Sequence, residues 1–246
     1  MSPCLQSGRI VSPRVTAELN HRYFSRQTFD FLSALAENNN RTWFETHLQE
    51  YEKAVRTPAL AFISDMAKEM PAISPHFRAL SKKVGGSLMR IQRDIRFGKD
   101  KTPYKTNIGI QFRHEVGKDI HAPGFYVHIE PDNCFVGVGL WRPDADALFK
   151  IRAAIVKHGD AWVAARDDKI FMTYFTPEGD VLAKSPRGFA KDHPLMEDIK
   201  RKDFISLAEL RPSTVTSKNF LPQVTERFRQ ATPFMRFLCK ALDIRF

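Results

Sequence analysis

The sequence predicts an α+β fold, in which an antiparallel β-meander of about four or more strands packs against N-terminal, middle and C-terminal helices. Apolar residues recur at helical spacing on both sides of a central segment, residues 89–141, where they instead alternate with polar residues. The strands of this segment follow one another through short turns, which favours a meander over βαβ units. With 246 residues, 43% of them hydrophobic, the chain is long enough to bury a core.

The N-terminal part predicts an arm followed by helices. Residues 1–27 lack periodicity and are expected to form an extended or disordered arm, so that a single α+β domain spans residues 28–246. Thr28 begins an amphipathic helix that ends at the asparagines 38–40. Asn40 is a favourable N-cap for the next helix.

Two prolines set the limits expected for the following helix. Thr57 is followed by Pro58, and proline is favoured in the first turn of a helix. The helix is expected to end before Pro71, because a proline inside a helix removes a hydrogen bond.

The central segment predicts four strands, each with one buried face. Arg93 breaks the alternation of the first strand by falling among its apolar residues. The predicted strands are residues 89–97, 108–113, 125–130 and 134–141.

The C-terminal part predicts alternating helices and short strands. Pro222 and Pro233 are expected to interrupt the last helical region. The predicted elements are helices at 144–157, around Trp162, at 195–201 and within 216–242, and strands at 171–175 and 204–207.

Positive charge is concentrated in the central segment. The chain has a formal charge of +10, and the 40 residues from His76 to Glu115 contain ten Lys/Arg and three Asp/Glu, or +7 of the total. Such a field favours phosphorylated metabolites, nucleic acid or acidic protein surfaces as partners. The alternative is a basic surface that only maintains solubility.

The cysteines and the hydropathy pattern argue against a disulfide-stabilised protein and against a transmembrane protein. Cys4, Cys134 and Cys239 form no Cys-x-x-Cys pair, so we predict neither a disulfide framework nor a zinc site. No apolar run approaches the roughly 20 residues that span a bilayer. We therefore expect a cytoplasmic protein without a membrane partner. The sequence specifies neither a cofactor nor an oligomeric state.

The segment from Arg93 to Lys105 is the first candidate site. Guanidinium groups offer paired donors to phosphate or carboxylate, and lysine adds point charge. A buried Arg93 would have to meet a carboxylate or a ligand. Alternatively, Asp94 and Asp100 pair with neighbouring cations and the segment is purely structural. The candidate anion-binding residues are Arg90, Arg93, Arg96, Lys99, Lys101, Tyr104 and Lys105.

The third predicted strand provides a second candidate site. His128 and Glu130 share a face with Tyr126, because alternate residues of a strand point the same way. With Asp94 nearby, this face could perform acid–base chemistry or bind a metal, or it could be an ordinary hydrogen-bonded sheet surface. Trp43, Trp141 and Trp162 lie on apolar faces and are predicted to be core anchors.

The motif R-D-x-R-F-x-x-D-K-x-P-Y-K runs from Arg93 to Lys105. It resembles the hallmark of a family of bacterial and fungal proteins defined by a domain of unknown function. Further similarity lies at Asn38-Asn39-Asn40-Arg41-x-Trp43-Phe44, Gly124-Phe125-Tyr126, Glu130-Pro131, Gly137-x-Gly139-x-Trp141-x-Pro143, Pro186-Arg187-Gly188-Phe189 and His193-Pro194. The resemblance covers about residues 28–242 and implies one domain without implying a reaction.

Three hypotheses for function follow. The first is binding of an anionic, phosphate-bearing small molecule at the Arg93–Lys105 segment and the adjoining sheet face. The second is an enzyme that acts on an anionic substrate through Asp94, His128 or Glu130. The third is a nucleic-acid-binding protein, with Phe97 and Tyr104 available to stack on bases.

Overall fold

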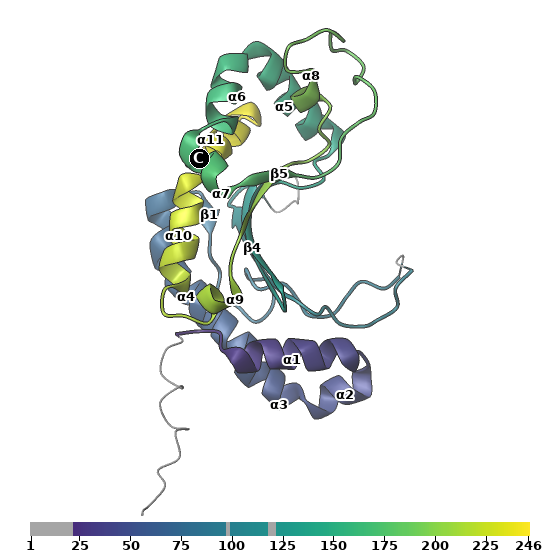
Figure 1. The fold of residues 1–246 in the computed structure, drawn as a ribbon, viewed down its shortest axis with the longest axis vertical. Coiled ribbons are helices and arrows are strands. Elements are labelled where there is room, and N and C mark those ends of the chain that lie inside the picture. The colour runs from purple at the N-terminus through teal and green to yellow at the C-terminus, as the bar shows by residue number, and fades with distance from the viewer. Residues whose placement is uncertain (1–21, 97–98, 118–121) are drawn as a thin grey trace, which may run out of the picture.

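A six-stranded sheet with every neighbouring pair antiparallel lies at the centre of the molecule, which confirms the predicted α+β fold (Figure 1). The computed structural model of the chain describes residues 22–96, 99–117 and 122–246. The strand order is β1-β2-β3-β4-β6-β5. The strands are β1 (Phe77–Arg78), β2 (Ile108–His114), β3 (Gly124–Glu130), β4 (Asn133–Leu140), β5 (Thr176–Glu178) and β6 (Phe204–Glu209).

The register of the meander places apolar residues on one face and polar or small residues on the other. Ile110 lies opposite Val127, and both side chains are fully buried. One position further along, Gln111 lies opposite Tyr126, and both are only half-buried. The sheet therefore has one apolar face in the core and a second face that carries polar or small residues.

Helices cover only the apolar face. Helices α4 (Thr57–Ile73), α10 (Phe220–Gln230) and α11 (Thr232–Ala241) lie along this side of the sheet (Figure 1). The contact is largely aromatic, since the Phe62 ring lies 4.8 Å from Phe220 and 6.4 Å from Phe112, and Phe228 lies 4.6 Å from Phe125 between ring centroids. The opposite face of the sheet is left open to the right in Figure 1.

The N-terminal helix begins earlier than predicted. Helix α1 spans Arg26–Glu37, and the Thr28 hydroxyl accepts from the Ser25 N–H (3.1 Å) instead of starting the helix. Tyr23 and Phe24 are buried, so packing begins upstream of residue 28. Residues 1–21 of the predicted arm lie outside the described residues.

The following helices show one predicted cap and one wrong boundary. Asn40 caps α2 (Arg41–Thr46), and its side chain accepts from the Trp43 N–H (2.9 Å), as predicted. Helices α3 (Leu48–Tyr51) and η1 (Glu52–Arg56), a π-helix, lead directly into α4. Helix α4 passes through Pro71 and ends at Ile73, because the proline removes only its own N–H bond and the Ser74 N–H beyond it still donates to the Met70 carbonyl (2.8 Å).

The predicted strand at 89–97 is instead one arm of an irregular hairpin. We call the described residues between 88 and 105 the basic hairpin. Among the described residues its arms are joined by one isolated bridge, Gln92 opposite Tyr104, and by the Arg93 N–H donating to the Pro103 carbonyl (2.9 Å). Pro103 has no N–H to donate in return, so a regular ladder cannot continue.

The C-terminal half contains two further corrections. Residues 171–175 belong mostly to a helix, α7 (Lys169–Tyr174), because the Asp168 side chain caps it by accepting from the Phe171 N–H (2.9 Å). Pro222 does not interrupt α10, since it lies in the first turn, where the backbone N–H has no helical partner. The remaining helices are α5 (Ala145–Lys157), α6 (Gly159–Arg166), α8 (Met196–Ile199) and α9 (Pro212–Val215).

The remaining helices lie at the two ends of the sheet. A lobe that contains α5, α6 and α8 lies at one end, and α1 to α3 lie at the other (Figure 1).

Within the described part of the chain, no helix is both long enough and apolar enough to cross a membrane.

Candidate functional site

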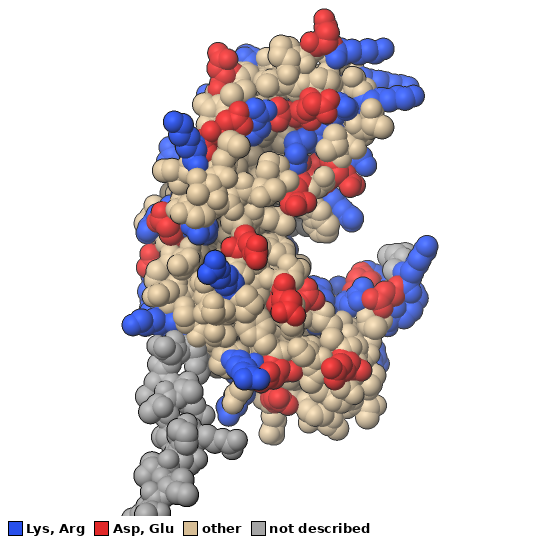
Figure 2. All heavy atoms as spheres, in the orientation of Figure 1, with Lys and Arg blue, Asp and Glu red and all other residues tan. Residues whose placement is uncertain are grey.

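The open face of the sheet lines two adjoining hollows. The surface is hollowed on this side, between the lobe of α5, α6 and α8 and the basic hairpin (Figure 2). The first, which we call the basic pocket, has a volume of about 900 Å³. The second, which we call the apolar groove, has a volume of about 510 Å³. Met89, Gln111 and Arg113 line both, so the two hollows adjoin along these side chains.

Positive charge dominates the lining of the basic pocket. Its two acidic residues, Asp94 and Glu115, face six basic ones. Of these six, Arg56 forms an ion pair with Glu52, and Arg78 forms one with Glu115. The six basic residues are Arg56, Arg78, Lys83, Arg90, Lys105 and Arg113.

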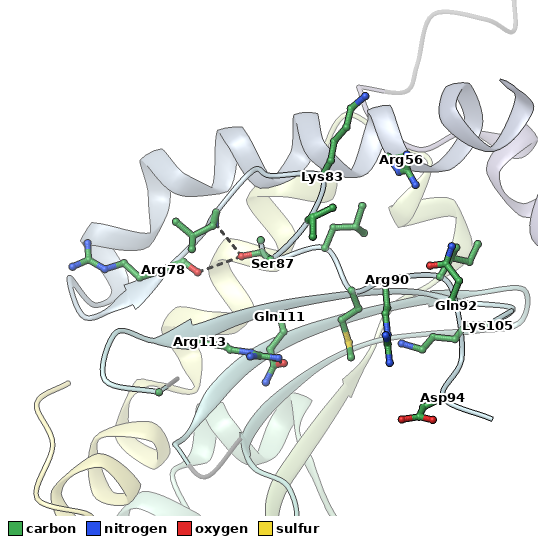
Figure 3. A pocket seen from close by; sticks show the side chains of 18 of the residues that line it. Arg56, Arg78, Lys83, Ser87, Arg90, Gln92, Asp94, Lys105, Gln111 and Arg113 are labelled. Atoms are coloured by element: carbon green, nitrogen blue, oxygen red, sulfur yellow. Dashed lines mark hydrogen bonds between the residues drawn. The ribbon is translucent and has the colours of Figure 1, made fainter. Parts of the chain in front are cut away.

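Arg90 and Lys105 point toward one another from opposite arms of the basic hairpin (Figure 3). The Lys105 N–H donates to the Ile91 carbonyl (2.8 Å), which fixes the two arms side by side. Within residues 22–96, 99–117 and 122–246, neither the Arg90 nor the Lys105 side chain makes a hydrogen bond or an ion pair. Burial, and then the charges of Arg90 and Arg93, lower the pKa of Lys105 below its usual 10.5.

Arg93 holds the hairpin together and does not line the basic pocket. Its guanidinium forms an ion pair with Asp100 and donates to the Thr102 hydroxyl (2.8 Å). Asp100 in turn accepts from the Thr102 N–H (2.9 Å). Arg93 therefore meets a carboxylate, one of the two partners expected, but its side chain is 37% exposed and not buried as its place on an apolar row suggested.

The remaining cations of the hairpin lie outside the basic pocket. Arg96 donates to both carboxylate oxygens of Asp94 (2.9 and 2.7 Å), and these hydrogen bonds lower the pKa of Asp94. Lys101 donates to the Ile95 carbonyl (2.9 Å), and Lys99 is exposed. Of the seven predicted anion-binding residues, only Arg90 and Lys105 line the basic pocket.

Tyr104 connects the hairpin to the N-terminal helices. The Asn39 side chain donates to the Tyr104 carbonyl and accepts from the Tyr104 N–H, both at 3.0 Å. The Tyr104 ring is buried and stacks on Phe44, with 4.1 Å between centroids. Two motifs that are far apart in the sequence therefore meet here. The Tyr104 ring is not available to stack on a base as predicted, and Phe97 lies outside the described residues.

A chain of hydrogen bonds runs along the open face of β3. The His128 Nδ1 lies 3.2 Å from the Tyr126 hydroxyl, and its Nε2 lies 3.2 Å from Glu130. Thr106 also donates to Glu130 (2.9 Å), and the His128 ring stacks on Phe135. Burial raises the pKa of Tyr126 to about 12, so the phenol stays protonated and neutral at physiological pH.

The three candidate catalytic residues do not share one hollow. Asp94 lines the basic pocket, His128 lines the apolar groove, and Glu130 lines neither. Among the described residues, no group of three or more His, Cys, Asp or Glu is arranged to hold a metal ion. The polar groups around His128 instead satisfy one another.

Comparison with protein families shows the family to which the chain belongs. The profile of the family described as conserved hypothetical protein (DUF2461) matches residues 27–237. The chain belongs to this family. No curated protein matches it. The match spans all six strands of the sheet and the basic hairpin, and it assigns no function.

Several residues that line the two hollows of this family member were not predicted from the sequence. Arg113, Arg78 and Lys83 lie outside the Arg93–Lys105 motif, so their place in the lining of the basic pocket depends on the tertiary fold. Trp141, predicted to be a core anchor, is 60% exposed and lines the apolar groove. Gly137 and Gly139, which precede Trp141, were the sequence signal that could have indicated the groove. A strand with few side chains leaves room for another group to approach its backbone.

Replacing Asn39 with alanine is expected to lower the free energy of unfolding by about 1–3 kcal/mol, since both backbone groups of Tyr104 lose their partner. Urea unfolding measures this difference. Asn38→Ala is the matched control, because the exposed Asn38 side chain bonds only to Ala34 in its own helix. Equal loss in the two variants would show that Asn39 does not hold the hairpin.

Proposed function

We propose that the protein binds a small anionic, phosphate-bearing ligand in the basic pocket, with Arg90 and Lys105 as its direct contacts. The observation that supports this most is the approach of two cations, neither of which forms an ion pair with a carboxylate of the described residues; the nearby Asp94 pairs with Arg96 instead. Like charges held close together raise the free energy of the folded protein, and a bound anion relieves that repulsion.

The chemistry of the surrounding side chains fits a phosphate. The Arg90 guanidinium offers paired N–H donors, and Lys105 offers a point charge from the other arm of the hairpin. Arg113 uses its Nε to donate to Gln111 (3.1 Å), which leaves its terminal N–H groups for a ligand. The ligand would therefore be contacted from the hairpin and from β2.

The other predicted anion-binding residues have different roles in this proposal. Arg93, Lys101 and Tyr104 stabilise the hairpin through the contacts described above. Arg96 and Lys99 contribute to the positive field at its outer end, which raises the rate at which anions arrive.

The shape of the pocket supports a small molecule over a polynucleotide. Its volume of about 900 Å³ lies within the range of roughly 300–1,000 Å³ that is usual for small-molecule sites. Cys134 and Cys239 are buried free thiols, which agrees with a reducing cytoplasm, where phosphorylated metabolites occur. We include that location in the proposal.

Neutralising either direct contact is expected to weaken the binding of inorganic phosphate about 10-fold to 100-fold, because each removes a charge-assisted hydrogen bond. Calorimetric titration of Arg90→Gln and Lys105→Gln measures this, with the exposed Lys218→Gln as control. Neither variant should be less stable than the native protein, because each relieves repulsion. Unchanged phosphate affinity together with lower stability would assign these residues a structural role and overturn the proposal.

Anion affinity is also expected to fall as the pH rises toward the ordinary lysine pKa of 10.5. Lys105 has a lowered pKa in the free protein, and a bound anion favours its protonated form, so binding takes up a proton in this range. Sulfate is a suitable probe because it does not itself titrate there.

The matched control for this pH dependence is Lys105→Arg, since arginine stays charged throughout the range. Its sulfate affinity should decline less steeply than that of the native protein. Parallel pH profiles for the two proteins would exclude Lys105 as a contact of the anion.

A further inference from the structure

We infer that the ligand also has an aromatic ring, which lies in the apolar groove while its phosphate occupies the basic pocket. This inference rests on the proposed function and specifies the ligand class. The two hollows are joined at Met89, Gln111 and Arg113, so one molecule can occupy both. Arg113 lies where the two hollows meet, so it can bind the phosphate group close to the bond that joins this group to the ring.

Part of the floor of the groove, at Gly124, Gly137 and Gly139, is bare backbone. Gly124 lies opposite Gly139 on the neighbouring strand, and both line the groove together with Gly137. At Gly139 the backbone itself requires glycine, because φ is +112° and a Cβ would lie 2.0 Å from the Phe204 carbonyl oxygen. Adjacent strands without side chains leave a flat surface, which fits a planar ring.

Gly124 differs from Gly139 because a side chain would fit there. An added Cβ would come no closer than 3.4 Å to the Phe112 carbonyl oxygen, which is ordinary van der Waals contact. The glycine at this position is therefore not required by packing, and its effect is to keep the groove open. A larger residue would fill the proposed ring site without disturbing the sheet.

The walls of the groove are apolar and partly uncovered. Trp141 is 60% exposed, an unusual position for the largest apolar side chain, and Leu207 and Ile205 line the same groove. The polar groups of the floor are already satisfied, because Tyr126, His128 and Glu130 bond to one another. The groove thus favours a ring over a polyhydroxylated body such as a sugar.

Titrations with methyl phosphate and 1-naphthyl phosphate test this inference. The native protein is expected to bind 1-naphthyl phosphate at least about tenfold more tightly, because the ring buries apolar surface in the groove. Trp141→Ala should reduce that advantage severalfold while leaving the affinity for methyl phosphate unchanged. Gly124→Leu should reduce the advantage as well, and because Gly124 lies opposite Arg113, its effect is read as the ratio of the two affinities. Phe149→Ala, which removes an exposed aromatic residue outside the groove, should preserve it.

The possible outcomes separate this inference from the proposed function. Equal affinity for the two phosphates, or an advantage that survives both groove variants, would overturn the ring site while leaving the anion site in place. Failure of both phosphates to bind would overturn the proposed function itself. Adenosine 5′-monophosphate, as a third probe, distinguishes a nucleotide from a simple aryl phosphate: whichever of the two binds more tightly than methyl phosphate, with an advantage that the groove variants remove, identifies the ring.

Discussion

The architecture depends on a sheet that buries only one of its faces. Side chains alternate along each strand, so the residues that complete the core oblige their neighbours to face the other way. Helices α4, α10 and α11 cover the first face, and the second is left with glycines, a hydrogen-bonded Tyr126–His128–Glu130 row and partly exposed apolar residues. Both hollows follow from this single constraint.

The basic hairpin converts the open face into a charged site. Most of its polar side chains hold it together: Arg93 pairs with Asp100, Arg96 pairs with Asp94, and Asn39 fixes the backbone of Tyr104. Arg90 and Lys105 are the exceptions, because they stand close together and neither forms an ion pair among the described residues. A stable hairpin can hold two like charges in place, and the proposed anion site depends on this feature.

The sequence predicted the fold well where periodicity and local chemistry agreed. The strand alternation of the meander and the Asn40 cap were confirmed, because both are local. The strand predicted at 89–97 was wrong because Pro103, on the opposite arm, cannot complete the ladder. Trp141 and Arg113 could not be assigned to the site, because their exposure depends on which face of the sheet the helices leave open. Charge density indicated the region of the proposed site, but it did not separate Arg90 and Lys105 from the cations that stabilise the hairpin.

The most direct test of the central claim is a crystal structure of the protein grown with saturating inorganic phosphate. The account predicts one phosphate whose oxygens lie about 2.7–2.9 Å from both the Lys105 Nζ and the Arg90 guanidinium, with Arg113 as a third contact. A phosphate bound elsewhere while Arg90 and Lys105 have no anion between them would contradict it. So would direct pairing of either cation with a carboxylate of the same chain.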